Sequence, residues 1–226
     1  MQKLAIILFI FLIPVNLNAD ISYYKNLKTI KIDIFRNNKL IGYNNYFFKK
    51  NKDLFEVENE IKFKVALLGA DVFKLFGRGK EKYLNNKLIS FKSQTIQNKK
   101  NKYVNLNYDK NKDLFIIDGS SFKGTVSIDS VVGNWWNHEL LKTEKQISPV
   151  SGSIKEQIVT FLGKEKIKLY GKEYLADHFK IQSKNLNTPK NKKLNFDVWV
   201  DKKSLMILKV SYSKFGEWEY RLKSYN

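Results

Sequence analysis

Hydrophobic and polar residues alternate with a period of two along most of this chain, which predicts β-strands rather than helices. The clearest example runs from residue 55 to residue 65. One face of it carries Phe55, Val57, Ile61, Phe63 and Val65, and the other carries Glu56, Glu58, Glu60, Lys62 and Lys64. Alternation of this length predicts a strand with one buried and one solvated face, in an antiparallel sheet.

Similar segments recur, and short links rich in Asn, Lys, Asp or Gly join them, as β-hairpins require. The links expected as turns are residues 37–38, 51–53, 85–87, 99–102, 163–164, 201–203 and 214–216. About eleven or twelve strands are expected at this spacing. The fold class predicted is all-β, with one large curved antiparallel sheet that forms an open or closed barrel and little helix.

Two stretches depart from the period of two. Residues 66–78 have apolar positions compatible with a helix, although Gly69, Gly77 and Gly79 weaken that interpretation. Residues 129–140 are expected to hold a helical turn. No other part of the chain after residue 20 has a convincing helical period.

The first nineteen residues are typical of a secretory signal peptide, with Lys3, an apolar run over Leu4–Ile13 and Ala19 before the cleavage point. The alternative is an uncleaved anchor, but a run of about 10 residues is too short to span a membrane as a helix. The mature chain, residues 20–226, is therefore expected to be a single β-rich domain without a transmembrane segment. Its expected location is the periplasm or the secreted fraction.

The net charge of +19 comes from 41 basic residues against 22 acidic ones. One interpretation is attraction to an anionic envelope surface, and the other is a solvated surface rich in lysine. Arginine, which binds phosphate in a bidentate manner, occurs only at Arg36, Arg78 and Arg221. Export also argues against nucleic acid as a partner. Cysteine is absent, so disulfides and thiolate metal sites are excluded.

Two aromatic segments are candidates for ligand contact. Trp135 and Trp136, followed by Asn137, point to opposite faces if the chain is extended, so they face a ligand or fill the core from an irregular turn. Trp199 lies between Asp197 and Asp201 and either lines a polar lumen or lies at a rim. The alternative for Asp201 is that it opens a hairpin turn.

The sequence has few residue patterns that are typical of catalytic, metal or cofactor sites. No catalytic residue, metal site or cofactor is therefore predicted. The two histidines, His138 and His178, lack metal-ligand spacing. Glu81 is a lone carboxylate between two lysines, and its expected default is a surface ion pair. An enzyme would require Glu81, Asp197, Asp201 or His138 to converge in one pocket.

Several short segments occur along the chain in an order that is similar to that of a known protein family. They are Ile34–Gly42, the alternating strand to Leu68, Glu81 with Tyr83, Asn86–Leu88 ahead of Ser93–Thr95, Trp136–Asn137, and Asp197–Asp201 with Tyr220. This order resembles the bacterial exported family known as domain of unknown function 6134, over about residues 28–223. Tyr83 stands where the pattern tends to Trp. The family implies a β-rich fold and no known activity. A wider resemblance to periplasmic lipoprotein-carrier half-barrels implies a curved sheet around an apolar groove.

Three functions remain open from the sequence. The leading hypothesis is a noncatalytic binder of an apolar or amphipathic, lipid-like ligand in the concavity of the sheet. The candidate ligand-binding residues are Trp135, Trp136, Asn137, Trp199, Glu81, Asp197 and Asp201. The second is an envelope scaffold or protein-interaction module with a filled core, and the third is an enzyme. A cavity lined by aromatic residues would favour the first hypothesis.

Overall fold

The computed structural model describes residues 21–67 and 69–226, so the expected signal peptide lies outside the described residues. The first eight strands are β1 (Thr29–Arg36), β2 (Lys39–Asn51), β3 (Leu54–Leu67), β4 (Ala70–Leu84), β5 (Lys87–Gln97), β6 (Lys100–Asp109), β7 (Leu114–Gly119) and β8 (Lys123–Ser127). The others are β9 (Val131–Val132), β10 (Lys145–Ile147), β11 (Ile154–Leu169), β12 (Lys172–Ser183), β13 (Asn195–Asp201), β14 (Ile207–Ser213) and β15 (Glu217–Tyr225). Three short 3-10 helices complete the described part: η1 (Ile21–Tyr24), η2 (His138–Leu141) and η3 (Lys190–Lys192).

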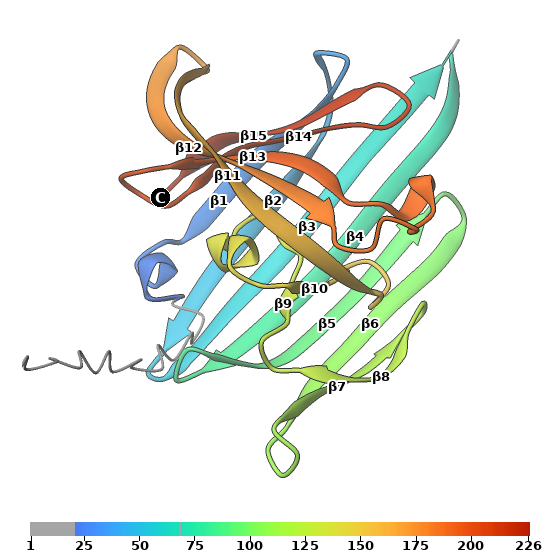
Figure 1. Cartoon of the computed structure of the whole chain (residues 1–226), viewed down its shortest axis with the longest axis vertical. Helices are drawn as coiled ribbons and strands as arrows, with labels where there is room; N and C mark the ends of the chain where they lie inside the picture. Colours follow the sequence, from blue (N-terminus) through green and yellow to red (C-terminus); the bar gives the residue numbers. More distant parts are fainter. Residues whose placement is uncertain (1–20, 68) are drawn as a thin grey trace, which may run out of the picture.

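All fifteen strands belong to one sheet, in the order β8-β7-β6-β5-β4-β3-β2-β1-β15-β14-β13-β12-β11-β10-β9. Every pair is antiparallel except β9 with β10. The first and last strands of the chain, β1 and β15, pair with each other and join two meanders into one curved sheet (Figure 1). β8 and β9 are the two edge strands of this order and do not pair with each other, so the sheet forms an open barrel. This confirms the predicted single curved antiparallel sheet, with more strands than the eleven or twelve expected.

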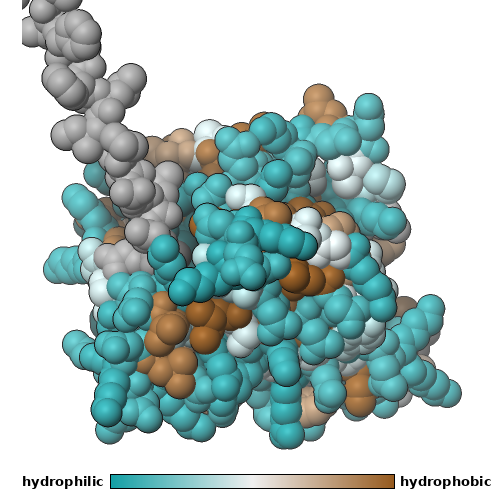
Figure 2. All heavy atoms as spheres, turned by 90° about the horizontal axis from the view of Figure 1, so that it is seen from below, coloured by the Kyte–Doolittle hydropathy of each residue, from teal (hydrophilic) through white to brown (hydrophobic). Residues whose placement is uncertain are grey.

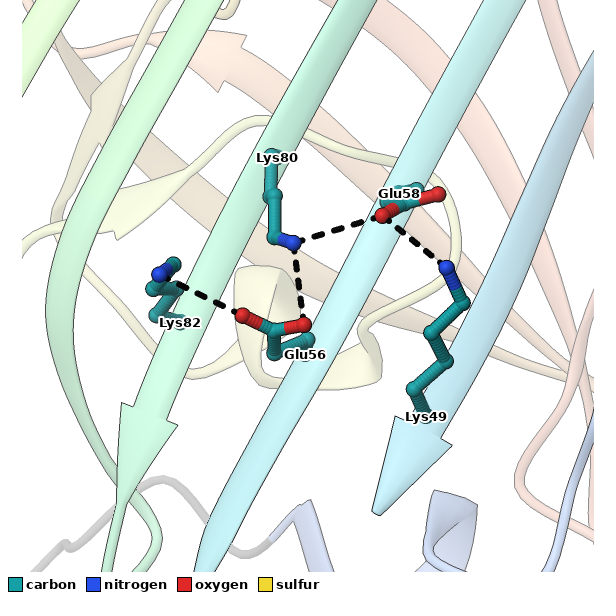
Figure 3. A network of polar contacts seen from close by, with 5 residues as sticks. All are labelled: Lys49, Glu56, Glu58, Lys80 and Lys82. Atoms are coloured by element: carbon teal, nitrogen blue, oxygen red, sulfur yellow. Dashed lines mark hydrogen bonds and ion pairs between the residues drawn. The ribbon is translucent and has the colours of Figure 1, made fainter. Parts of the chain in front are cut away.

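The apolar and charged residues of β3 lie on opposite faces of the sheet, as predicted. Phe55, Val57 and Phe63 are buried on the inner face of the sheet. Acidic residues of β3 lie on the outer face beside lysines of the neighbouring strands (Figure 3). The ion pairs drawn there are Lys80 with Glu56 at 2.9 Å, Lys80 with Glu58 at 3.3 Å, Lys82 with Glu56 at 3.4 Å and Lys49 with Glu58 at 3.2 Å. Hydrophilic residues cover most of the face seen in Figure 2, with apolar patches between them.

The helix considered for residues 66–78 is wrong, because β4 begins at Ala70 and pairs with β3 along its length. Strand pairing between distant residues decides the conformation here, and Phe73 stacks on Phe63 across the pair. Gly77 and Gly79 also belong to this strand. A side chain at Gly79 would meet the ring of Phe91 at 3.2 Å, so glycine lets the inner face pack closely at this point.

The turn expected at residues 163–164 is also wrong, since β11 continues through it to Leu169. Gly163 takes a φ of +138° next to a register shift in the pairing with β12, so it forms a bulge. The hairpin tip then reaches β1, where the Tyr170 hydroxyl donates a hydrogen bond to Asp33 at 2.8 Å. The bulge bends β11 without ending it.

The apolar core lies on the inner side of the curved sheet and has two parts. The larger part joins η1, η2 and β1–β4 with β11–β15. The smaller part joins β5–β8 with β9 and β10, so it spans the open side of the barrel. The Ser93 hydroxyl donates a hydrogen bond to the carbonyl of Pro149 at 2.6 Å, which adds a polar contact across the same opening.

Candidate ligand-binding site

The segment Gly133–His138 leads from β9 to η2 and packs against the inner face of the sheet. Trp136 is 1% exposed and is the largest of the fully buried side chains. Rings from η1, β2, β3 and β4 surround it, with centroid distances of 4.9 Å to Tyr24, 5.6 Å to Phe48, 6.5 Å to Phe55 and 6.0 Å to Tyr83. Trp136 is therefore a core residue on an irregular segment, which was one of its two interpretations.

Glu81 binds this segment from β4. Its Oε1 accepts hydrogen bonds from the Trp136 indole at 2.9 Å and from the Asn134 amide at 2.6 Å. The Tyr83 hydroxyl donates to Oε2. Burial raises the pKa of Glu81, and the three donors act in the opposite direction by stabilising the carboxylate.

The default of a surface ion pair for Glu81 is wrong, because its side chain is only 2% exposed. Odd-numbered residues of β4 face inward from position 73 to position 83, whereas Lys80 and Lys82 face outward. The sequence held a signal for this, since Glu81 shares a strand face with Tyr83.

Two buried tyrosines hold the same segment at further points. The Tyr46 hydroxyl accepts hydrogen bonds from the backbone N–H of Trp135 at 3.1 Å and from Asn44 at 2.8 Å. The Tyr24 hydroxyl accepts one from the backbone N–H of His138 at 3.1 Å. Burial raises the pKa of both tyrosines, so both hydroxyls are neutral at physiological pH.

A cavity of about 500 Å³ lies beside this segment, between the inner face of β4–β7 and residues 127–145. The link between β8 and β9 forms one wall, so the cavity lies at the open side of the barrel. Its apolar wall includes Leu88, Tyr108, Phe115, Ile128 and Val132. Its size falls within the range of about 300–1,000 Å³ that is typical of small-molecule sites.

The structure brings three of the predicted candidates together. Glu81, Trp136 and Asn137 lie at the same place, and Asn137 lines the cavity while the other two lie behind its wall. Trp135 is half-buried and packs against Phe196, with ring centroids 5.3 Å apart, and against Tyr220 at 6.3 Å. Neither tryptophan of this pair lines the cavity.

Trp199 and Asp197 lie elsewhere, on the outer face of β13. The Trp199 ring stacks on the His178 ring, with centroids 4.3 Å apart. The ammonium of Lys209, on β14, lies 3.7 Å from the centroid of the Trp199 ring. Asp197 pairs with His178 at 3.1 Å and with Lys180 at 2.8 Å. These contacts occupy both side chains outside the barrel.

Asp201 ends β13 and has the turn role that was its alternative interpretation. Its Oδ2 accepts hydrogen bonds from the backbone N–H of Ser204 at 3.1 Å and from the Ser204 hydroxyl at 2.5 Å. The carboxylate candidates Glu81, Asp197 and Asp201 therefore do not converge in one pocket. In the part of the chain that the structure describes, no group of three His, Asp or Glu residues is placed to hold a metal ion.

Sequence reasoning missed two buried polar residues of the cavity wall, Ser130 and Glu139. Glu139 follows Asn137, whose side chain caps η2 by accepting from the Glu139 backbone N–H at 3.0 Å. An Asn two residues ahead of a Glu is a signal for a helix start. Ser130 gave no comparable signal, because it lies in a short link between strands.

Within residues 21–67 and 69–226, no helix is long and apolar enough to cross a membrane. A β-barrel-like protein of the domain of unknown function DUF1849 from Brucella abortus has a similar crystal structure, with a TM-score of 0.58 at 8% sequence identity. The match covers 88% of this chain and 97% of that chain, and it shows a shared fold. No curated protein matches the chain. The family model described as Domain of unknown function (DUF6134) matches residues 33–223, and the chain therefore belongs to this family.

Proposed function

We propose that this protein is an exported, noncatalytic binder of an apolar or amphipathic ligand, and that the ligand occupies the cavity between β4–β7 and residues 127–145. The cavity of about 500 Å³ at the open side of the barrel carries the proposal. Aliphatic and aromatic side chains form part of its wall, as in a small-molecule site, and polar and charged residues form the rest, which suits an amphipathic ligand.

The surroundings of the cavity favour a preformed site. Tyr83 lines it and is held by its hydrogen bond to Glu81, which also binds Trp136 and Asn134 behind the wall. Asn137 lines it as well and is fixed by its cap contact with Glu139. A site whose wall is already ordered loses less conformational entropy when a ligand binds.

A second candidate function is an envelope scaffold, and the packing of the larger core favours it. Trp136, Tyr46 and Phe55 pack as buried core residues in the concavity near β1–β3. Exposed apolar side chains such as Leu162 and Phe215, at 53% and 86% exposure, would then contact a partner. The two functions differ in whether the cavity is occupied.

Native mass spectrometry of the full chain, expressed with its own N-terminal segment in a Gram-negative host, separates them. We expect a polypeptide that begins at Asp20 and carries an extra mass that organic solvent extracts. Leu88→Trp should lose that mass, because the larger ring fills the cavity from its apolar wall.

Leu84→Trp is the matched control, since Leu84 is 46% exposed on the neighbouring strand and lies outside the cavity wall. It should retain the extra mass. A bare polypeptide mass for the wild type would contradict a tightly held ligand and favour the scaffold. A mass that begins at Met1 would contradict export by a cleaved signal peptide.

A further inference from the structure

Ser130 lines the cavity, and its side-chain hydroxyl has no hydrogen-bond partner among the described residues. The residue is 3% exposed. Its backbone N–H is satisfied by the carbonyl of Ser127 at 3.1 Å, so only the side chain is left over. A buried unpaired hydroxyl costs about 1–3 kcal/mol, which a ligand in the cavity would recover.

Glu139 adds a second incomplete group to the same wall. Its side chain is buried, and the Lys142 ammonium contacts Oε1 at 2.7 Å. His138 Nε2 contacts the same oxygen at 3.3 Å. These hydrogen-bond and ion-pair contacts are made by Oε1, and Glu139 lines the cavity, so Oε2 is available as an acceptor there.

The other buried polar side chains of this wall are already satisfied. The Tyr83 hydroxyl donates to Glu81, and the Asn137 Oδ1 accepts from the Glu139 backbone. The half-buried Thr143 also donates to the carbonyl of Asp129 at 2.8 Å. Among the described buried polar side chains of this wall, the unused hydrogen-bonding capacity is therefore the Ser130 hydroxyl and one carboxylate oxygen of Glu139.

We propose that the cavity selects an amphiphile with an uncharged hydroxyl head group, which donates to Glu139 Oε2 and shares a hydrogen bond with Ser130 Oγ. This rests on the proposed function and specifies its ligand class. A carboxylate head group has no hydrogen to donate to Glu139 Oε2, and an ammonium head group has no lone pair to accept the hydrogen of the Ser130 hydroxyl. A hydroxyl group can do both, and its apolar chain lies against Leu88 and Phe115.

Isothermal titration calorimetry with 1-octanol, octanoate and octylamine tests this on the mature full-length chain. We expect 1-octanol to bind about tenfold or more tightly than either charged compound. Ser130→Ala should weaken 1-octanol binding about 5- to 10-fold, as expected for one hydrogen bond. Glu139→Gln should bring octanoate closer to 1-octanol, because an amide at this position can donate a hydrogen bond to a carboxylate head group.

Ser127→Ala is the matched control. Ser127 also lines the cavity, but its hydroxyl already donates to Asp129 at 3.0 Å, so binding of 1-octanol should be unchanged. Ser130→Ala removes an unpaired group and is expected to fold normally, which thermal unfolding verifies.

Equal affinity for octanoate and 1-octanol, together with no effect of Ser130→Ala, would overturn the selection of a hydroxyl head group. The proposed function would survive that result, because octyl compounds would still bind. Failure of all three compounds to bind the wild type would overturn both.

Discussion

Glu81→Ala is expected to lower the free energy of unfolding by about 4 kcal/mol. The substitution removes the acceptor shared by the Trp136 indole and the Asn134 amide, and it removes the partner of the Tyr83 hydroxyl. All three donors are then left in a buried site, where each unsatisfied group costs about 1–3 kcal/mol before partial relaxation. Urea unfolding followed by far-UV circular dichroism measures the change.

Glu58→Ala is the matched control, because Glu58 lies on the outer face and pairs with Lys49 and Lys80 in partly exposed contacts (Figure 3). Such pairs contribute less than about 1 kcal/mol. Equal losses from the two substitutions would contradict the role of Glu81 in holding the Gly133–His138 segment.

Trp136→Ala should cost about 4 kcal/mol, as typical for truncation of a fully buried large aromatic residue. The ring packs edge-on against Tyr24 and Phe48, and its N–H is the donor to Glu81. Its removal leaves a void between η1 and the sheet and takes away one of the two donors to Glu81 Oε1. Equilibrium unfolding in urea, monitored by circular dichroism because the substitution removes a fluorophore, gives the value.

Trp135→Ala, at the neighbouring position in the chain, is the variant for comparison. Trp135 is half-buried and makes ring contacts with Phe196 and Tyr220, so we expect a loss of about 2 kcal/mol. A larger loss for Trp135 than for Trp136 would reverse the assignment of the core residue in this pair.

Much of the fold could be predicted because the two-residue period is a local property. Residues 55–65 carry it without interruption, and β3 has the predicted faces. The region of residues 66–78 was ambiguous because consecutive apolar residues suit a helix and a strand equally. Its pairing with β3 is a tertiary effect, and it decides the conformation of β4.

The candidate site was predicted only in part. Trp136, Asn137 and Glu81 meet in the structure, but the local signal that Glu81 faces inward is limited to the strand face that it shares with Tyr83. Trp199 illustrates the reverse problem, because β13 has buried side chains on both faces and alternation cannot tell lumen from exterior. Ser130 lines the cavity from the link between β8 and β9, and the position of this link depends on the pairing of distant strands, which no short sequence window encodes.

Fluorescence titration with N-phenyl-1-naphthylamine, an apolar probe that brightens in an apolar site, tests the central claim most directly. The wild type and Leu84→Trp should show the same saturable increase, whereas Leu88→Trp should bind the probe about tenfold more weakly or not at all. Titrations that coincide for all three proteins would contradict a ligand site in the cavity between β4–β7 and residues 127–145.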